Sequence, residues 1–571
     1  MDRLPQHTFE TSSSGFRHLF PYPPYTSHKV AAQHSRSFSF PVTEDEIHQY
    51  FIKQNRLSDP VLSASTMSTP IAPGPDEISH YYYGLPSRPR LVARTNFADK
   101  WKNIKGVEFA PAKVLRNVGR HPIAVLWNDS TGPLRRSIIE ALIGIDWSAI
   151  DILSIGSETD EPKKCPVVLF ISVRPDSTSF ATCYAIASRC LKILRSHSIH
   201  DVHVEIKESD VQRSYSIPQQ APIDSPKLSS GPFRVYSHAG ALWSEFLGVS
   251  VANSTTPYCN GTKCLYLRQR NTNNVLALTC RHVVLPLLGP ENRFDDRDRN
   301  SQSELIIRPG DRALEYQKSL IAGQLENVGD LVEMADSSLT LSLNEKQRRK
   351  HILRSSLPGW KEVERHLEAL SEPATRIIGH LLYSPSHASS EANSGNPRLR
   401  DWALIQVHQN KHSTRLTALQ NQVRVGPTHD LTHKLFSAAM AEKINCHSWL
   451  PLNPGREPAS LLRQTIPETE MFRPTEETGS LDAPAIVVVL YGATSGLCIG
   501  LANEVKSITR KPVDGYWYES EEWCLIGQRL TFDCRRDHFS RNGDSGSCIF
   551  DDRGRIGGMV TGGLSEGHDV T

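Results

Sequence analysis

A serine flanked by two glycines lies in the run Asn-Gly-Asp-Ser-Gly-Ser, residues 542–547 of this 571-residue chain. Gly543 and Gly546 allow the backbone to turn tightly, so that the hydroxyl group of Ser545 can stand out of the turn. The same turn can aim the amides of Gly543 and Ser545 at one point, where they would stabilise a tetrahedral oxyanion. The pattern indicates nucleophilic catalysis by serine, with an ordinary Gly/Asp/Ser hairpin loop as the alternative.

A serine nucleophile needs a general base, and the base needs a carboxylate that orients it. His282 follows an apolar, strand-like run that starts at Ala277. Asp401 opens an alternating apolar strand over residues 401–407. The chain order is therefore His282, Asp401, Ser545, which is the order of the chymotrypsin-like triad and not that of subtilisins or α/β-hydrolases.

These three segments resemble the trypsin-like serine endopeptidase family, in which a Thr-Ala-x-His-like segment, an Asp-(Ile/Trp)-Ala-Leu-like strand and Gly-Asp-Ser-Gly recur in this order. Residues 486–500 resemble the Gly-x-Thr-(Thr/Ser)-Gly-Leu hairpin that begins the second barrel of many members. Residues 557–563 resemble the edge strand along which the family's substrates lie. The five segments together are far more specific than any one of them.

The resemblance implies an all-β, double six-stranded, chymotrypsin-like barrel over residues 233–571, as in non-secreted members with an added N-terminal domain. It implies peptide-bond hydrolysis through an acyl-enzyme, with His282 as base, Asp401 orienting it, and the amides of Gly543 and Ser545 holding the oxyanion. It also implies substrate contacts at Phe539, Val560, Thr561 and Gly562. Phe539 stands where trypsin-like enzymes carry a pocket-floor carboxylate, so we expect an apolar or filled pocket rather than selection for Arg or Lys.

Two departures from the family pattern lead to further expectations. Asp544 would be buried, and in secreted relatives this aspartate pairs with a newly cut N-terminal amine. A buried carboxylate needs a partner, and we expect the side chain of Arg541 or His538 to serve. Relatives also continue with a strand and a C-terminal helix beyond the position of Thr571, so either the barrel closes without them or the sequence is truncated.

Two other functions remain open. A catalytically inactive pseudo-protease would bind a peptide or partner along residues 559–561 without cutting it. A serine esterase or acyl transferase would use the same acyl-transfer chemistry. Zinc is a further alternative for His282, because three cysteines lie near it in the sequence, but their spacings do not match the usual closed zinc sites. We therefore expect neither a metal nor a cofactor. The three cysteines are Cys259, Cys264 and Cys280.

Composition narrows the range of partners and compartments. Lys and Arg number 64 against 62 Asp and Glu, a net charge of +2, so no nucleic-acid partner is implied. No apolar run approaches the length of a membrane span, and we expect no membrane association. The start of the chain has no secretion signal, and eleven cysteines at irregular spacings read as reduced thiols. We therefore expect an intracellular protein, cytoplasmic or nuclear, that acts on a peptide or protein substrate.

The N-terminal half divides into three predicted parts. Residues 1–78 are rich in Ser, His and Pro and are expected to be largely disordered, with a short helix at 43–48. Residues 79–210 alternate between strand and helix patterns and predict an α+β sandwich domain. Residues 211–232 predict a linker. Within the sandwich we expect strands at 123–127, 167–173 and 202–206, helices at 134–142 and 180–196, and a solvated acidic edge at Asp151, Glu158, Asp160 and Glu161.

Two insertions interrupt the predicted barrels. Residues 340–372 are charged and helical, and they predict a helical hairpin interrupted at Pro358-Gly359, with a solvated basic face. A strand is expected to resume at 376–383. Residues 445–482 are rich in Pro, Glu and Thr and predict a surface loop.

Overall fold

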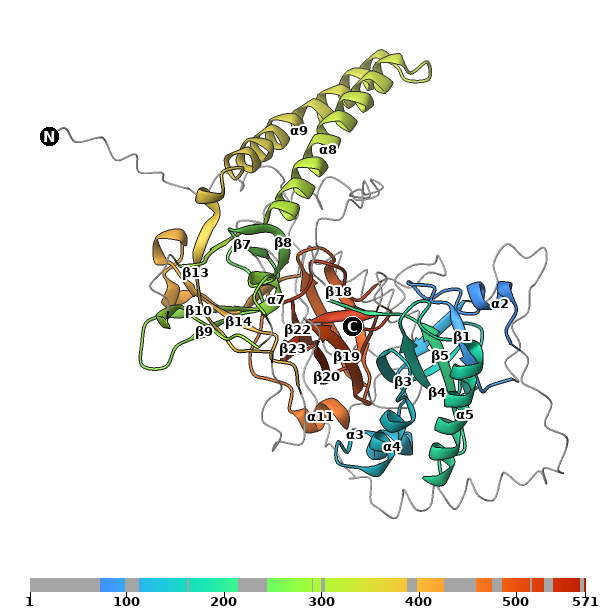
Figure 1. Ribbon diagram of the computed structural model, residues 1–571. Helices are drawn as coiled ribbons and strands as arrows, with labels where there is room; N and C mark the ends of the chain where they lie inside the picture. Colours follow the sequence, from blue (N-terminus) through green and yellow to red (C-terminus); the bar gives the residue numbers. More distant parts are fainter. Residues whose placement is uncertain are drawn as a thin grey trace, which may run out of the picture. The chain divides into compact units, whose positions relative to one another are not determined.

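Figure 1 shows the computed structural model of the chain. It describes residues 72–97, 112–161, 164–213, 244–289, 291–298, 303–387, 398–425, 459–474, 485–513, 516–527, 538–564 and 569–571. All of them belong to one compact unit, Leu57–Thr571. The predicted helix at 43–48 and most of the region predicted to be disordered lie outside the described residues. Strands outnumber helices and form several sheets.

The N-terminal domain has the predicted α+β character. Its sheet has helices α3, α4 and α5 packed on one face, where their apolar side chains form one core with β3, β4 and β5. Strands β4 and β5 are parallel, as a connection through α5 requires. The elements are α2 (Pro75–His80), β1 (Leu91–Arg94), β2 (Lys113–Arg116), α3 (Pro122–Asn128), α4 (Pro133–Ala141), β3 (Trp147–Ser157), β4 (Val167–Val173), α5 (Phe180–Ser196) and β5 (Val202–Glu208).

Four of the five elements predicted in this domain are confirmed, and α5 has the predicted bounds. The strand predicted at 123–127 is wrong, because the segment is helix α3. Pro122 occupies the first turn and the His121 side chain accepts a hydrogen bond from the Ile123 amide at 3.2 Å, which caps the helix. The predicted solvated acidic edge is wrong at Asp151, which is buried within β3.

The sheet of this domain crosses the predicted domain boundary. Its strand order is β1-β5-β4-β3-β19-β20, with β2 also paired to β3. The hairpin of β19 (Ser507–Val513) and β20 (Tyr516–Glu522) comes from the predicted protease half, and β19 pairs antiparallel with β3. The two halves of the chain therefore share one hydrogen-bonded sheet.

Two further sheets form the C-terminal half. The larger has the order β8-β7-β12-β13-β14-β10-β9, with β11 paired to β13. Its first and last members, β8 and β9, are consecutive in the chain and separated only by Lys263 and Cys264. The strands are β7 (Ser250–Asn253), β8 (Thr256–Thr262), β9 (Leu265–Arg268), β10 (Val275–Thr279), β11 (Phe294–Asp295), β12 (Leu305–Ile307), β13 (Ile377–Ser384) and β14 (Ala403–Val407). The strand predicted at 376–383 is confirmed by β13.

The smaller sheet has the order β21-β18-β17-β22-β23. The predicted strand–turn–strand at 486–500 is confirmed by β17 and β18, which pair from Val487↔Leu501 to Gly492↔Gly496. Gly496 has a φ of 65°, which only glycine adopts readily in such a turn. The strands are β17 (Val487–Gly492), β18 (Gly496–Ala502), β21 (Leu525–Gly527), β22 (Cys548–Asp551) and β23 (Ile556–Met559). The described pairings of both sheets run as open paths, and the double barrel stays a prediction.

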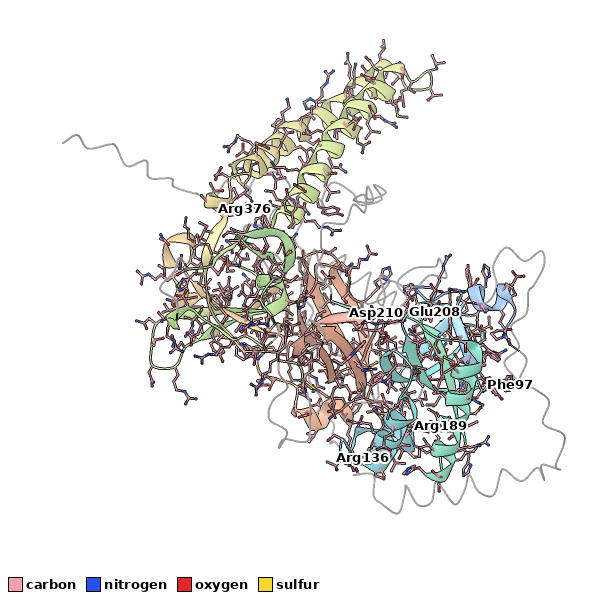
Figure 2. The ribbon with its side chains drawn as sticks, viewed as in Figure 1. Phe97, Arg136, Arg189, Glu208, Asp210 and Arg376 are labelled. Carbon is pink, nitrogen blue, oxygen red and sulfur yellow. The ribbon has the colours of Figure 1, made fainter. Side chains whose placement is uncertain are left out.

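The helical insertion is larger than predicted. It is a hairpin of α8 (Asp311–Ser337) and α9 (Leu343–Ala369), and α9 runs through Pro358 without the predicted break. A capping box at Ser342 begins α9, and apolar side chains of the two helices form their own core. At the base of the hairpin, Arg376 Nη2 lies 2.6 Å from Asp311 Oδ1 (Figure 2).

The second insertion is only partly a surface loop. Among its described residues, 459–474, β16 (Ala459–Leu461) pairs with β15 (Gln422–Arg424), and Leu462 and Ile466 are buried. The short helix α11 (Glu468–Phe472) follows. In the part of the chain that the structure describes, no helix is both long and apolar enough to cross a membrane.

Candidate active site

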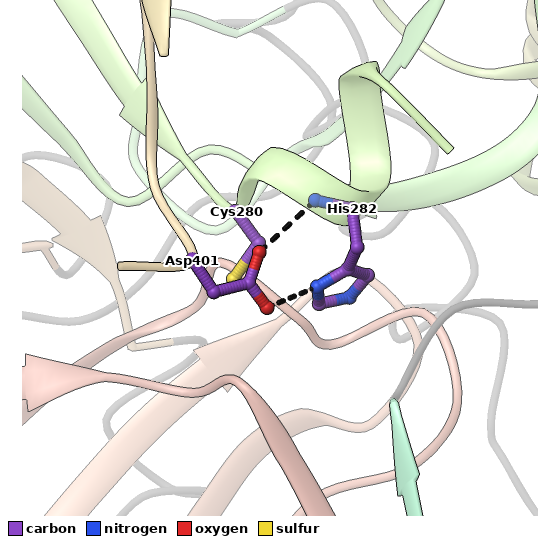
Figure 3. Close-up of side chains that lie close together, drawn as sticks. All are labelled: Cys280, His282 and Asp401. Atoms are coloured by element: carbon purple, nitrogen blue, oxygen red, sulfur yellow. Dashed lines mark hydrogen bonds and ion pairs between the residues drawn. The ribbon is translucent and has the colours of Figure 1, made fainter. Parts of the chain in front are cut away.

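His282 and Asp401 form a buried hydrogen-bonded pair. β10 leads into the one-turn helix α7 (Arg281–Val284), and the pairing of Thr279 with Ala403 brings the start of β14 beside it. His282 Nδ1 donates to Asp401 Oδ2 at 2.5 Å, and the His282 amide donates to Oδ1 at 3.0 Å (Figure 3). The two residues are 1% and 2% exposed. Because Nδ1 donates to the carboxylate, Nε2 carries the lone pair that a general base uses.

Arg281 anchors the loops around this pair, a role that the sequence did not reveal. Its guanidinium group is fully buried and donates to the carbonyl oxygens of Pro385, Gly289 and Asn292 at 3.0, 2.9 and 2.8 Å. A buried cation with several acceptors holds its surroundings firmly, so α7 cannot shift without breaking these bonds. In the sequence, the position of this arginine inside an apolar run was the one sign that its side chain would be buried.

The turn at Ser545 has the backbone that its glycines predict. Gly543 and Gly546 have φ values of 104° and 92°. The turn is fastened to β8, since the Thr262 amide donates to the Ser545 carbonyl at 2.7 Å and the Thr262 hydroxyl donates to the Gly543 carbonyl at 2.9 Å. On its other side the Gly546 amide donates to the Val560 carbonyl at 2.8 Å.

Close packing at two glycines joins the histidine segment to the serine turn. A Cβ atom at Gly261 would collide with both Val283, the neighbour of His282, and the carbonyl of Ser545. A Cβ atom at Gly546 would collide with the Thr279 hydroxyl at the end of β10. The structure therefore brings the three predicted catalytic segments to one place, from two different sheets.

The amides predicted to hold an oxyanion are available. In the part of the chain that the structure describes, neither the Gly543 amide nor the Ser545 amide donates to another group. Ser545 has no exposed surface, and its hydroxyl donates to the Thr561 carbonyl at 3.5 Å. The hydroxyl group of Ser545 thus lies next to the start of β24 (Gly562–Leu564).

Asp544 has partners, and one of them is the backbone amide of Arg541 rather than the predicted side chain of this residue. Its Oδ1 accepts from the amides of Thr494 and Ser495 at 2.9 and 3.1 Å, and its Oδ2 accepts from the Arg541 amide at 2.8 Å. Burial raises the pKa of this carboxyl group, and these hydrogen bonds oppose the rise. The expectation of a side-chain partner from Arg541 is corrected: the backbone of the β17–β18 turn and of Arg541 satisfies the carboxylate.

The predicted substrate contacts separate into two groups. Phe539 is buried in the core of the smaller sheet, against Gly500, and is not one of the residues that line the nearby cavity. Val560, Thr561 and Gly562 do line that cavity, which has a volume of about 270 Å³. Its wall also includes Asp151 of the N-terminal domain.

Three side chains at this place are of types that can bind a metal ion. Ligand atoms of Cys280, His282 and Asp401 lie within 4.8 Å of one another. Burial, with the nearby Asp401 charge, raises the pKa of the Cys280 thiol well above its usual value, and its Sγ donates to the Val560 carbonyl at 3.2 Å. A metal bound here would have to displace the proton of this thiol and its hydrogen bond to Val560. Cys259 and Cys264 do not belong to this group.

Known proteins give no direct guide to this site. Models of protein families do not match the chain, and a search of curated proteins finds no match either. The trypsin-like resemblance therefore stays a prediction that five short segments carry, and the chemistry of the site has to be argued from its own geometry.

Proposed function

We propose that this chain is a serine endopeptidase with the triad His282, Asp401 and Ser545. The observation that carries the proposal is the buried His282–Asp401 pair, with Nδ1 and the backbone amide of the histidine on the two oxygens of one carboxylate. A carboxylate held in this way fixes the imidazole tautomer and stabilises its charged form. The glycine-flanked Ser545 supplies the nucleophile on the adjoining turn.

The reaction follows from these roles. Ser545 Oγ attacks the scissile carbonyl while His282 accepts its proton, and the amides of Gly543 and Ser545 bind the developing oxyanion. His282 then gives the proton to the leaving amine. Water, activated by the same imidazole, hydrolyses the acyl-enzyme and regenerates the serine. No step calls for a metal or organic cofactor.

The strand connections support a chymotrypsin-like double barrel for this enzyme. β8 and β9 pair with opposite ends of the larger sheet, although they are parts of one continuous segment bent at Lys263-Cys264. A bent strand that serves both ends of a sheet is a simple way to close a barrel. The smaller sheet with its tight β17–β18 turn would then belong to the second barrel.

The substrate class follows from the surroundings of Ser545. The hydroxyl lies beside Thr561, where β24 begins, and a strand edge is a natural binding site for an extended peptide. The cysteines of the described residues are free thiols, as an intracellular enzyme requires. A peptide or protein substrate fits this edge better than a small ester.

Labelling by a fluorophosphonate tests the proposal. The wild-type protein is expected to react covalently, whereas Ser545→Ala and His282→Ala are not, since the first lacks the nucleophile and the second its base. Circular dichroism of each variant shows whether it is folded. A folded wild type that does not react would contradict the proposal and favour a peptide-binding pseudo-protease. A reactive protein that cleaves ester substrates but no peptide would point to an esterase or acyl transferase.

A further inference from the structure

The edge strand beside the nucleophile is already paired with a segment of the same chain. The first residues of the predicted linker form strand β6 (Val211–Arg213), which lies antiparallel to β24. The register is Arg213↔Gly562, Gln212↔Gly563 and Val211↔Leu564. An extended peptide that binds this edge of β24 would have to take the position of β6.

The other edge of β24 shows which backbone groups β6 occupies. The Leu564 amide donates to the Val570 carbonyl at 3.0 Å, so the backbone polar groups of Leu564 point away from β6. Because these groups alternate in direction along an antiparallel strand, those of Gly563 point toward β6 and bond to Gln212. The amide and the carbonyl group of Gly563 are therefore not available to a second strand.

β6 runs in the direction that a substrate of Ser545 would take. Moving from Leu564 to Gly562 corresponds to moving forward along β6, because the two strands are antiparallel. The next residue after Gly562 on this path is Thr561, whose carbonyl accepts a hydrogen bond from Ser545 Oγ. A substrate needs its acyl side at the nucleophile, so a peptide paired antiparallel with β24 would follow the same path as β6.

β6 is attached at its amino end and through its first side chain. The Ser209 amide donates to the Val173 carbonyl at 2.8 Å, and the Ser148 hydroxyl donates to the Ser209 carbonyl at 2.8 Å. Val211 packs against the buried apolar cluster that contains Leu564. β6 therefore stays close to β24 whether or not the two strands are paired, and a free peptide has to compete with a tethered strand.

We propose that β6 is a built-in blocking strand, which covers the edge of β24 that binds the substrate, so that a peptide reaches Ser545 only when β6 has left this edge. The inference rests on the proposed endopeptidase function and concerns the regulation of the same site. β6 and the substrate exclude each other, so the pairing of β6 acts as competitive inhibition within the chain. A strand of three residues makes few hydrogen bonds with its partner, which keeps the pairing reversible.

Weakening the pairing is expected to activate the enzyme toward peptides. Gln212→Pro removes the N–H group that faces Gly563, whereas Gln212→Ala keeps it and is the matched control. The full chain is assayed by hydrolysis of fluorescein-labelled casein. Gln212→Pro is expected to raise kcat/KM by about tenfold, the effect of one lost hydrogen bond, through a lower KM. Gln212→Ala is expected to behave as the wild type. An unchanged kcat/KM in a folded Gln212→Pro variant would overturn the inference.

A covalent lock tests the same point without a proline. Val211 and Leu564 lie opposite each other in a non-hydrogen-bonded pair. The Cα atoms of such a pair are about 4.5 Å apart, a separation that a disulfide spans. The double variant Val211→Cys/Leu564→Cys is expected to lose casein cleavage when it is oxidised and to regain it on reduction, whereas the wild type keeps its activity through the same treatment. An oxidised variant that cleaves casein as fast as its reduced form would contradict the blocking role of β6.

Fluorophosphonate labelling of the same samples separates this inference from the proposed function. The reagent needs an activated Ser545 but no strand edge, so every form is expected to be labelled at the wild-type rate. Labelled protein in which no form cleaves casein, or in which neither the lock nor Gln212→Pro changes the cleavage, would overturn the blocking role of β6 while the activation of Ser545 stands. A folded wild type that is not labelled would overturn both.

Discussion

The candidate active site and the contact between the two halves both bury carboxylates, but they satisfy them in different ways. At the site, both oxygens of Asp401 accept hydrogen bonds from His282, and Asp544 accepts three backbone amides. We call the contact between the N-terminal domain and the segment 503–522 the domain seam. There, Glu521 is bound by two cations, Arg135 and Lys506, the latter at 2.8 Å.

Other acidic groups of the domain seam have fewer partners. Burial raises the pKa of Asp151 to about 6 and that of Glu504 to about 8. Among the described residues, one oxygen of each has no hydrogen-bond partner. At the site, hydrogen bonds from backbone amides and from His282 stabilise the buried carboxylates. At the domain seam, ion pairs stabilise Glu521, and a raised pKa favours the neutral forms of Asp151 and Glu504. The first arrangement suits catalysis, and the second makes the association of the halves sensitive to pH.

The largest expected effect is that of Asp401→Asn on catalysis. An asparagine can offer its amide N–H to Nδ1 and so stabilise the wrong imidazole tautomer, which lowers the rate of hydrolysis by about 10⁴. The rate of fluorophosphonate labelling measures this loss, and a thermal melt shows that the fold persists. A labelling rate close to the wild type would mean that the buried pair does not activate Ser545.

Next in size is the loss of stability on breaking the ion-pair cluster of the domain seam. Glu521→Gln leaves Arg135 and Lys506 as buried charges without their counter-ion, which is expected to cost about 3–5 kcal/mol of unfolding free energy. Glu519→Gln, at an exposed residue two positions earlier in the same strand, is the control and should change stability by less than about 0.5 kcal/mol. Urea unfolding measures both, and equal effects would show that the cluster does not hold the halves together.

The pH dependence of stability tests the protonation of Asp151. Its pKa is about 6 in the folded protein against a usual 3.8. The folded state therefore keeps the proton while the unfolded state loses it, and stability falls as the pH rises from about 4 to 6. Asp151→Asn has no proton to lose at this position. The wild type should therefore lose about 3 kcal/mol of unfolding free energy relative to Asp151→Asn over this window. A difference that does not vary with pH would contradict the raised pKa.

Local patterns predicted most of the elements that position the site. The helix at 180–196 and the turn between β17 and β18 were found because their periodicity and glycines are unambiguous. The strand predicted at 123–127 is a helix, because a short apolar run is compatible with a strand and with a buried helix equally well. Pro358 did not break α9, since the core that Trp360 and Leu367 share with α8 outweighs the cost of a proline.

Those local patterns could not predict contacts between segments that are far apart in the sequence. The pairing of β3 with β19 joins residues more than three hundred positions apart, and no local signal marks two strand edges as partners. The pairing of β6 with β24 was hidden in the same way, because a short strand inside a Pro- and Ser-rich stretch looks like a linker. The proposed triad rests on three residue types in a known order. The carbonyl groups that bind Arg281 could not be predicted, because they lie in loops whose conformation depends on the whole fold.

The smallest expected effect comes from Arg541, whose side chain is one of the two partners that the sequence predicts for Asp544. Since Arg541 donates to that carboxylate through its backbone amide, Arg541→Ala keeps the hydrogen bond and should change the unfolding free energy by less than about 0.5 kcal/mol. Asp544→Asn, by contrast, turns an N–H group toward backbone donors and should cost about 1–3 kcal/mol. Urea unfolding of the two variants decides between a backbone and a side-chain partner. A large loss in Arg541→Ala would mean that the site, like the domain seam, relies on a charged side chain to hold its buried carboxylate.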